Sequence, residues 1–153
     1  MHAMPMTTMT THVTARARLA EAFAWLTRFP HSFRQLLFRL AVGSVFMKAG
    51  LTKIASWETT VALFRDEYQV PIFSPQLAAS MAATFELGCS ALLIAGLATR
   101  LAALPLLGML AVIQVFVYPN AWADHLTWGS ILVALLTGGP GRASIDRFLG
   151  LER

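Results

Sequence analysis

Hydrophobic positions are gathered into four blocks that polar connections separate. The blocks run from about 36 to 56, 75 to 97, 101 to 118 and 126 to 137. Each of the first three approaches the ~20 residues that carry an α-helix across a hydrocarbon core of ~30 Å. The fourth is shorter and spans only if its helix begins within the preceding AWADH. The pattern predicts an all-α protein, an integral membrane four-helix bundle.

The polar segments divide the chain further. Between the first two blocks, WETTVALFRDEYQVPIFSP carries several charges, and its middle, TTVALFRDEY, is expected to form a short amphipathic helix on the surface. Near the N-terminus, ARARLAEAFAWLTRFPHSF suits either an interfacial helix broken at Pro30 or a basic tail without structure. We expect a cytoplasmic basic tail over 1–35, disordered over 1–15, a membrane domain over 36–148 and a C-terminal tail over 149–153.

Basic residues flank the blocks unevenly. In a four-span bundle, eight of the 12 Lys and Arg residues fall on one side: Arg16, Arg18, Arg28, Arg34, Arg100, Arg142, Arg147 and Arg153. Arg65 alone falls on the other side. The positive-inside rule therefore predicts that both termini are cytoplasmic, in a multi-pass inner-membrane protein. Trp57, Tyr118 and Trp122 then form an aromatic belt at the outer interface.

Composition narrows the classes of function. Hydrophobic residues make up 56% of the 153 positions, which exceeds the apolar content of soluble domains, about 45–50%. Charged residues make up only 13%. The net charge of +4 does not indicate nucleic acid, because basic residues flank apolar blocks rather than cluster with aromatics. The single cysteine, Cys89, excludes an internal disulfide or a CxxC pair. The histidine spacing predicts no metal or haem site.

Three cations lie inside the first block, where FMKAGLTKIASW holds two lysines. At 100° per residue, an arc of roughly 80° contains Arg39, Gly43, Gly50 and Lys53, whereas Lys48 points almost to the other side. The two glycines would let another helix approach closely. We expect this arc to face the bundle interior.

Glu86 interrupts the second block and needs a partner. It shares a face with small residues suited to close packing, namely Ala79, Ala82, Ala83 and Ser90. An unpaired carboxylate at this depth costs at least a few kcal/mol, so we expect a cation from the first helix beside it. The depth in the bilayer favours Lys48 as the partner of Glu86, whereas the helix face favours Arg39. We prefer Arg39, because its long side chain can span an axial gap, whereas a side chain on the wrong face of the helix cannot turn toward Glu86. Lys53 lies close enough to the outer boundary to snorkel to the interface without a partner. Together, the candidate ligand-binding or buried charge network consists of Arg39, Lys48, Lys53 and Glu86.

Three stretches resemble the DoxX family of small four-helix membrane proteins: RLAVGSVFMKAGLTKI, VPIFSPQLAASMAATFELGCSALLIAGLATRLAALPL and GGPGRASID. The resemblance covers about residues 36 to 148. It places the family pattern on Arg39, Gly43, Gly50, Lys53, Pro71, Glu86, Gly96, Arg100, Gly139, Gly141 and Asp146. Lys48 is extra to that pattern.

The resemblance implies a role in redox or stress responses. Members are similar to subunits of thiosulfate:quinone oxidoreductase and to membrane partners of redox-stress enzymes, and some accompany metal-stress systems. We therefore expect a non-catalytic membrane subunit that anchors a protein partner or forms a homo-oligomer, with quinone as a candidate ligand of the buried charges. Alternatives are a small-solute or metal transporter, acting as an oligomer or with a partner, and a scaffold in which the charges only fix helix register.

Overall fold

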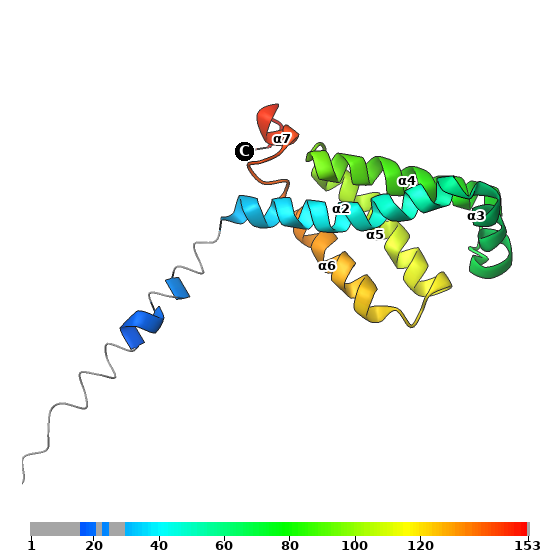
Figure 1. Ribbon diagram of the computed structural model, residues 1–153, viewed down its shortest axis with the longest axis horizontal. Coiled ribbons are helices and arrows are strands. Elements are labelled where there is room, and N and C mark those ends of the chain that lie inside the picture. Colours follow the sequence, from blue (N-terminus) through cyan, green and yellow to red (C-terminus); the bar gives the residue numbers. More distant parts are fainter. Residues whose placement is uncertain (1–15, 21–22, 25–29, 153) are drawn as a thin grey trace, which may run out of the picture. The chain divides into compact units, whose positions relative to one another are not determined.

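The computed structural model describes residues 16–20, 23–24 and 30–152, and within these ranges all regular structure is helical (Figure 1). The chain forms two units, residues 1–30 and 31–153. In the first unit, residues 16–20 and 23–24 are helical. The expectation for residues 1–15 and much of the predicted interfacial helix lie outside the described residues. The predicted all-α class is confirmed.

The second unit follows the hydrophobic blocks closely. Its elements are α2 (His31–Ala55), α3 (Trp57–Leu63), the π-helix η1 (Phe64–Tyr68), α4 (Pro75–Ala95), α5 (Thr99–Val112), the π-helix η2 (Ile113–Val117), α6 (Trp122–Gly138) and α7 (Ile145–Phe148). Helix α2 begins five residues earlier than predicted. Helix α6 begins inside AWADH, as a span of useful length requires, and the predicted surface helix is found as α3 and η1.

The four long helices pack in a closed cycle. Helix α2 contacts α4, α4 contacts α5, α5 contacts α6, and α6 returns to α2. Their shared core consists largely of aliphatic side chains, with Val42, Phe46, Leu93, Leu106 and Leu132 almost fully buried. A second apolar cluster joins Phe64 of η1 to Ala78, Ala79 and Ala82 near the start of α4. This second cluster fixes the α3–η1 segment against the bundle.

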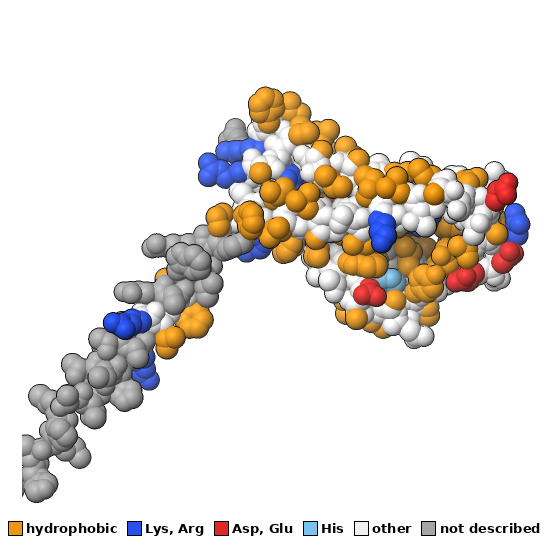
Figure 2. All heavy atoms as spheres, in the orientation of Figure 1, with side chains coloured by type: hydrophobic (Ala, Val, Ile, Leu, Met, Phe, Trp, Pro, Cys, Tyr) orange, Lys and Arg blue, Asp and Glu red, His pale blue; other side chains and the backbone are white. Residues whose placement is uncertain are grey.

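The surface of the long helices is apolar while several polar groups are buried. Helix α4 and the continuous segment Thr99–Val117 are long and apolar enough to cross a membrane, judged by length and composition. Large hydrophobic side chains are exposed on all four long helices, among them Leu37, Leu40, Leu51, Leu77, Leu101, Leu104, Leu126 and Val133. Figure 2 shows hydrophobic side chains spread along these helices, with most of the acidic groups in view at the end that carries α3 and η1.

Candidate functional site

Lys53 and Glu86 form the ion pair of the bundle interior. The Nζ atom of Lys53 donates to Oε1 of Glu86 at 2.8 Å, and the two side chains are 21% and 3% exposed. Thr60 fixes the end of α2 beside the pair, because its hydroxyl donates to the carbonyl oxygen of Lys53 at 3.0 Å. The predicted partnership of Glu86 with Arg39 is therefore wrong. The partner is Lys53, which the sequence placed in the candidate charge network without assigning it to Glu86.

The reason is the register between α2 and α4. A Cβ atom on Gly50 would lie 3.1 Å from the Cβ of Glu86, and one on Gly43 would lie 3.5 Å from the carbonyl oxygen of Ser90. These pairings place the last residue of α2, Ala55, opposite about residue 81, so α4 extends past α2 by about six residues, or about 9 Å. Depths counted from the two helix ends therefore placed Glu86 too far from Lys53.

A cavity of about 560 Å³ lies beside this ion pair. Its walls come from α2, η1, α4, α5, η2 and the loop before α4, and apart from Lys53, Glu86 and two tyrosines they are apolar. The remaining lining is aromatic, aliphatic and thioether: Phe64, Val70, Pro71, Ile72, Phe73, Ala78, Met81, Ala82, Phe85, Pro105, Gly108, Met109, Val112, Ile113, Phe116 and Val117. A site of this size and polarity suits a small ligand with an apolar body and one polar group.

Tyr68 and Tyr118 are the other polar residues of the lining. The hydroxyl group of Tyr118 donates to that of Tyr68 at 3.3 Å, and the two rings are 5.8 Å apart in an edge-to-face arrangement. Tyr68 also packs edge-to-face on Phe64 at 5.0 Å. Burial raises the pKa of Tyr68 above its ordinary value. Tyr68 is therefore a neutral phenol at physiological pH.

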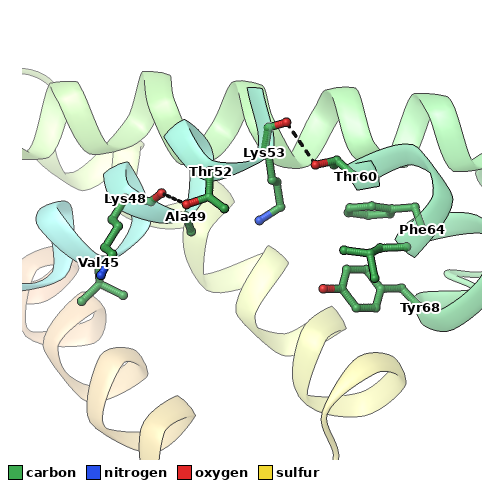
Figure 3. A pocket seen from close by; sticks show the side chains of 9 residues that line it. Val45, Lys48, Ala49, Thr52, Lys53, Thr60, Phe64 and Tyr68 are labelled. Carbon is green, nitrogen blue, oxygen red and sulfur yellow. Dashed lines mark hydrogen bonds between the residues drawn. The ribbon is translucent and has the colours of Figure 1, made fainter. Parts of the chain in front are cut away.

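A second cavity, of about 340 Å³, shares Lys53, Phe64 and Tyr68 with the first. Figure 3 shows the Lys53 ammonium and the Tyr68 hydroxyl pointing into the same space from α2 and η1. Lys48 also lines this cavity but extends away from Lys53 in that view. Lys48, which the family pattern does not include, is thus an exposed residue at the edge of the smaller cavity, whereas Lys53 lines both cavities.

Arg39 serves the other end of the bundle. It is 1% exposed, and its Nη2 atom donates to the carbonyl oxygen of Ala143 at 2.5 Å. Its guanidinium fills the space beside Gly96, whose φ of +72° favours glycine and where an added Cβ would clash with Nη1. Asp146 supplies the nearby negative charge. Arg39 therefore holds the C-terminal segment onto the turn between α4 and α5.

Asp146 and Arg100 complete this second cluster. The carboxylate of Asp146 accepts from the backbone N–H groups of Ala98 and Thr99 at 2.7 and 3.1 Å, so it caps α5 from 48 residues away in sequence. Arg100 donates to the carbonyl oxygens of Leu136 and Thr137 at the end of α6 and pairs with Glu152. These contacts provide hydrogen-bond partners for the unpaired backbone groups at the start of α5 and the end of α6.

The sequence reasoning did not find the tyrosine pair or the contact between His125 and Gln114. The Nδ1 atom of His125 and Oε1 of Gln114 are 2.5 Å apart, and Gln114 also donates to the carbonyl oxygen of Pro119 at 2.7 Å. The relevant signal was the polar residue Gln114 inside an apolar helix. Among the described residues, no three His, Cys, Asp or Glu side chains are grouped so as to hold a metal ion.

Comparison with known families identifies the type of protein. The DoxX family profile matches residues 35–119, which include every residue lining the larger cavity and both members of its ion pair. The chain belongs to the DoxX family. It is accordingly a DoxX membrane protein, and the match covers α2 through η2. Searches of curated proteins and of solved structures gave no match.

The residues of the DoxX pattern fall into two groups in the structure. Lys53 and Glu86, with Gly43 and Gly50, lie where α2 meets α4, and Pro71 lines the larger cavity. The remaining positions surround the C-terminal segment at the other end, namely Arg39, Gly96, Arg100, Gly139, Gly141 and Asp146. Among the small residues predicted to pack closely, Ala79 is fully buried against η1 and Ala83 is 5% exposed. The first group borders a cavity, and the second closes helix ends.

Proposed function

We propose that this DoxX protein is a multi-pass inner-membrane subunit that crosses the bilayer four times with both termini in the cytoplasm. The exposed apolar side chains on all four long helices support this topology, because a soluble bundle buries such a surface. The distribution of charge supports the orientation. Three acidic residues lie on α3 and η1, whereas Arg100, Arg142 and Arg147 lie at the opposite ends of the helices.

The ligand of this subunit is a quinone-type molecule bound in the 560 Å³ cavity. The observation that carries the proposal is a buried ion pair, Lys53 and Glu86, at the wall of an otherwise apolar and aromatic cavity. An ionisable pair inside a membrane protein commonly marks a site for a polar ligand group. The head group would meet the pair and the tyrosines, while the apolar lining would surround the ring and the start of a lipid tail.

The same site supports a binding rather than a catalytic role for the isolated chain. Among the described residues, the cavity lining supplies one carboxylate, one ammonium and two phenols, with no nucleophile paired to a base. We therefore infer that electrons are exchanged by a partner enzyme of a redox or stress response, and that this protein anchors it and provides the quinone site.

Quinone extraction tests the binding role. The protein, purified in mild detergent from its native membrane, should release quinone into organic solvent in near-stoichiometric amount. A matched pair of variants locates the site, because a Cβ on either Gly108 or Gly88 would meet nothing within 4 Å, but only Gly108 lines the cavity. Gly108→Leu should lose the quinone and Gly88→Leu should keep it. Quinone-free wild-type protein, or equal retention by both variants, would contradict the proposal.

Affinity purification tests the subunit role separately. Full-length protein isolated after gentle cross-linking should carry a redox enzyme in fixed ratio, and mass spectrometry would identify it. Recovery of the chain without any protein partner would contradict the role as an anchor while leaving the ligand site to be judged by the extraction.

A further inference from the structure

The carboxylate of Glu86 has one oxygen that the protein leaves without a partner. Oε1 accepts from Lys53 at 2.8 Å, whereas Oε2 is buried and has no hydrogen-bond partner among the described residues. The side chain is 3% exposed, so bulk water does not reach it freely. A buried acceptor is rarely left unsatisfied, because its desolvation is then uncompensated. Glu86 also lines the 560 Å³ cavity, so a small rotation of its carboxylate would turn Oε2 toward a ligand bound there.

The chemistry of that oxygen restricts the ligand. An ionised carboxylate accepts hydrogen bonds and donates none, so only a group with an O–H or N–H can satisfy it. A ligand that offers a carbonyl oxygen instead would place two acceptors against each other and leave Oε2 unpaired. The rest of the lining includes Phe64, Phe85, Phe116 and Met109, which suits a flat aromatic ring.

We infer that the cavity selects the reduced, hydroxyl-bearing form of its ligand: an aromatic diol of the quinol type, whose O–H donates to Oε2 of Glu86. This inference rests on the proposed quinone site and specifies which redox form occupies it. The oxidised quinone has only acceptors at the corresponding positions and binds more weakly. Preference for the quinol means that the partner enzyme delivers reduced ligand to this site or withdraws it from here.

The alternative polar contact is the Lys53 ammonium. Its Nζ atom donates to Glu86 and retains other N–H groups, which could meet the carbonyl of an oxidised quinone. In that arrangement the preference would reverse, because the donor would belong to the protein. The two arrangements are distinguished by comparing ligands that differ only in their hydrogen-bond donors.

Equilibrium binding to the full chain in lipid nanodiscs, under anaerobic conditions, provides the test. Three probes share one ring and a short tail: the benzoquinol, its benzoquinone and its dimethyl ether, which cannot donate. Quenching of the tryptophan fluorescence reports binding. We expect the quinol to bind about 10- to 100-fold more tightly than either of the others, the ratio given by one hydrogen bond to a charged group.

A substitution assigns the preference to Glu86. In Glu86→Gln the amide carbonyl can still accept from Lys53 while its NH₂ group faces the ligand, so the ratio of quinol to quinone affinity should fall to one or below. Glu58→Gln, an exposed change on α3 outside the cavity, should keep the wild-type ratio. If Glu86→Gln does not yield folded protein, the three probes on wild type still decide the direction.

The outcomes separate this inference from the proposed function. Equal affinity for quinol and quinone, or tighter binding of the quinone, would overturn the inference while the quinone site stands. A wild-type preference that Glu86→Gln preserves would also overturn the role of Oε2. Absence of binding by all three probes would remove the quinone site itself.

Discussion

A charge pair between two helices has to offset the free energy of taking both ions out of water. Lys53 keeps partial access to solvent, whereas Glu86 is almost fully buried, so the desolvation cost is larger for the carboxylate than for the ammonium. Such pairs contribute little when compared with a well-packed apolar substitute, yet losing one member leaves the other buried and uncompensated. The Lys53–Glu86 pair is therefore expected to specify helix register and ligand chemistry more than stability.

This asymmetry predicts the result of removing the lysine. Lys53→Met should lower the free energy of unfolding by about 3–5 kcal/mol, because Glu86 loses its charged partner. Adding Glu86→Leu should recover most of that loss, since an apolar pair of similar volume packs there instead. Unfolding in mild detergent measures both changes. The control is Lys48→Met, an exposed lysine that should change stability by less than about 0.5 kcal/mol. Equal behaviour of the two lysine variants would contradict the pairing.

Tyr68 makes a prediction about pH. Because burial raises its pKa in the folded state, the neutral phenol of Tyr68 contributes stability that is fully present below about pH 10 and is lost as pH rises through the folded-state value. The chain has only two tyrosines, so Tyr118→Phe isolates the titration of Tyr68. Phenolate absorbance should then appear at higher pH in the folded variant than in the same variant unfolded by guanidinium. Coincident titrations would exclude the burial described above.

At the level of elements, the contact between α2 and α4 depends on glycine. A Cβ on Gly50 would approach Cγ of Leu87 to 2.8 Å, whereas one on Gly88 would meet nothing within 4 Å. Gly50→Ala should therefore separate the helices and destabilise the fold by about 1–3 kcal/mol, despite the better helix propensity of alanine. Gly88→Ala should be neutral or slightly stabilising. Denaturation midpoints of the two variants compare them directly, and equal midpoints would show that α2 and α4 are not in close contact at Gly50.

Helix positions and helix register differ in how far the sequence predicts them. Hydrophobic blocks locate the long helices, because a helix surrounded by lipid or by the protein core has apolar residues in every turn. Register is a property of two helices together. Gly43 and Gly50 indicated which face of α2 packs inward, and Lys53 lies on that face with Arg39. The part of α4 that extends beyond α2 is covered by η1 at Ala78 and Ala79, a tertiary contact that the sequence does not reveal. Without that overhang, the depth argument placed Lys53 too near the outer boundary to be chosen as the partner of Glu86.

The role of the C-terminal segment was likewise outside local prediction. Asp146 caps α5 and Arg39 binds the carbonyl oxygen of Ala143, contacts that span 48 and 104 residues of sequence. No spacing rule relates such distant positions. The family pattern includes Arg39, Gly96 and Asp146 but does not relate them to one another. The structure shows the relation: one guanidinium and one carboxylate secure the turn between α4 and α5.

At the scale of the whole molecule, polar and apolar surfaces are distributed as a lipid environment requires. Arg39, Glu86, Ser90, Thr99 and Asp146 are buried, each at 2% exposure or less, while leucines face outward along every long helix. An arrangement with polar groups buried inside and apolar groups on the surface is stable when hydrocarbon replaces water as the surrounding solvent. This distribution, together with the asymmetric charge, leads to a definite prediction of topology.

Cysteine labelling tests that topology on the intact chain. Cys89 is the only cysteine and is buried, so Cys89→Ala provides a background without thiols. On this background, Asp66→Cys in η1 should react with a membrane-impermeant maleimide in intact cells, because four spans place η1 on the outer side. Gly150→Cys, beyond α7, should react only after the membrane is opened, because the proposed orientation places this end, with its basic residues, in the cytoplasm. Labelling of both positions in intact cells, or of neither, would place them on one side of the membrane and exclude the four-span topology. The expected result, labelling of position 66 but not of position 150 in intact cells, would place the cavity with Tyr68 and Tyr118 in the outer leaflet. A quinol tail can enter it there from the lipid.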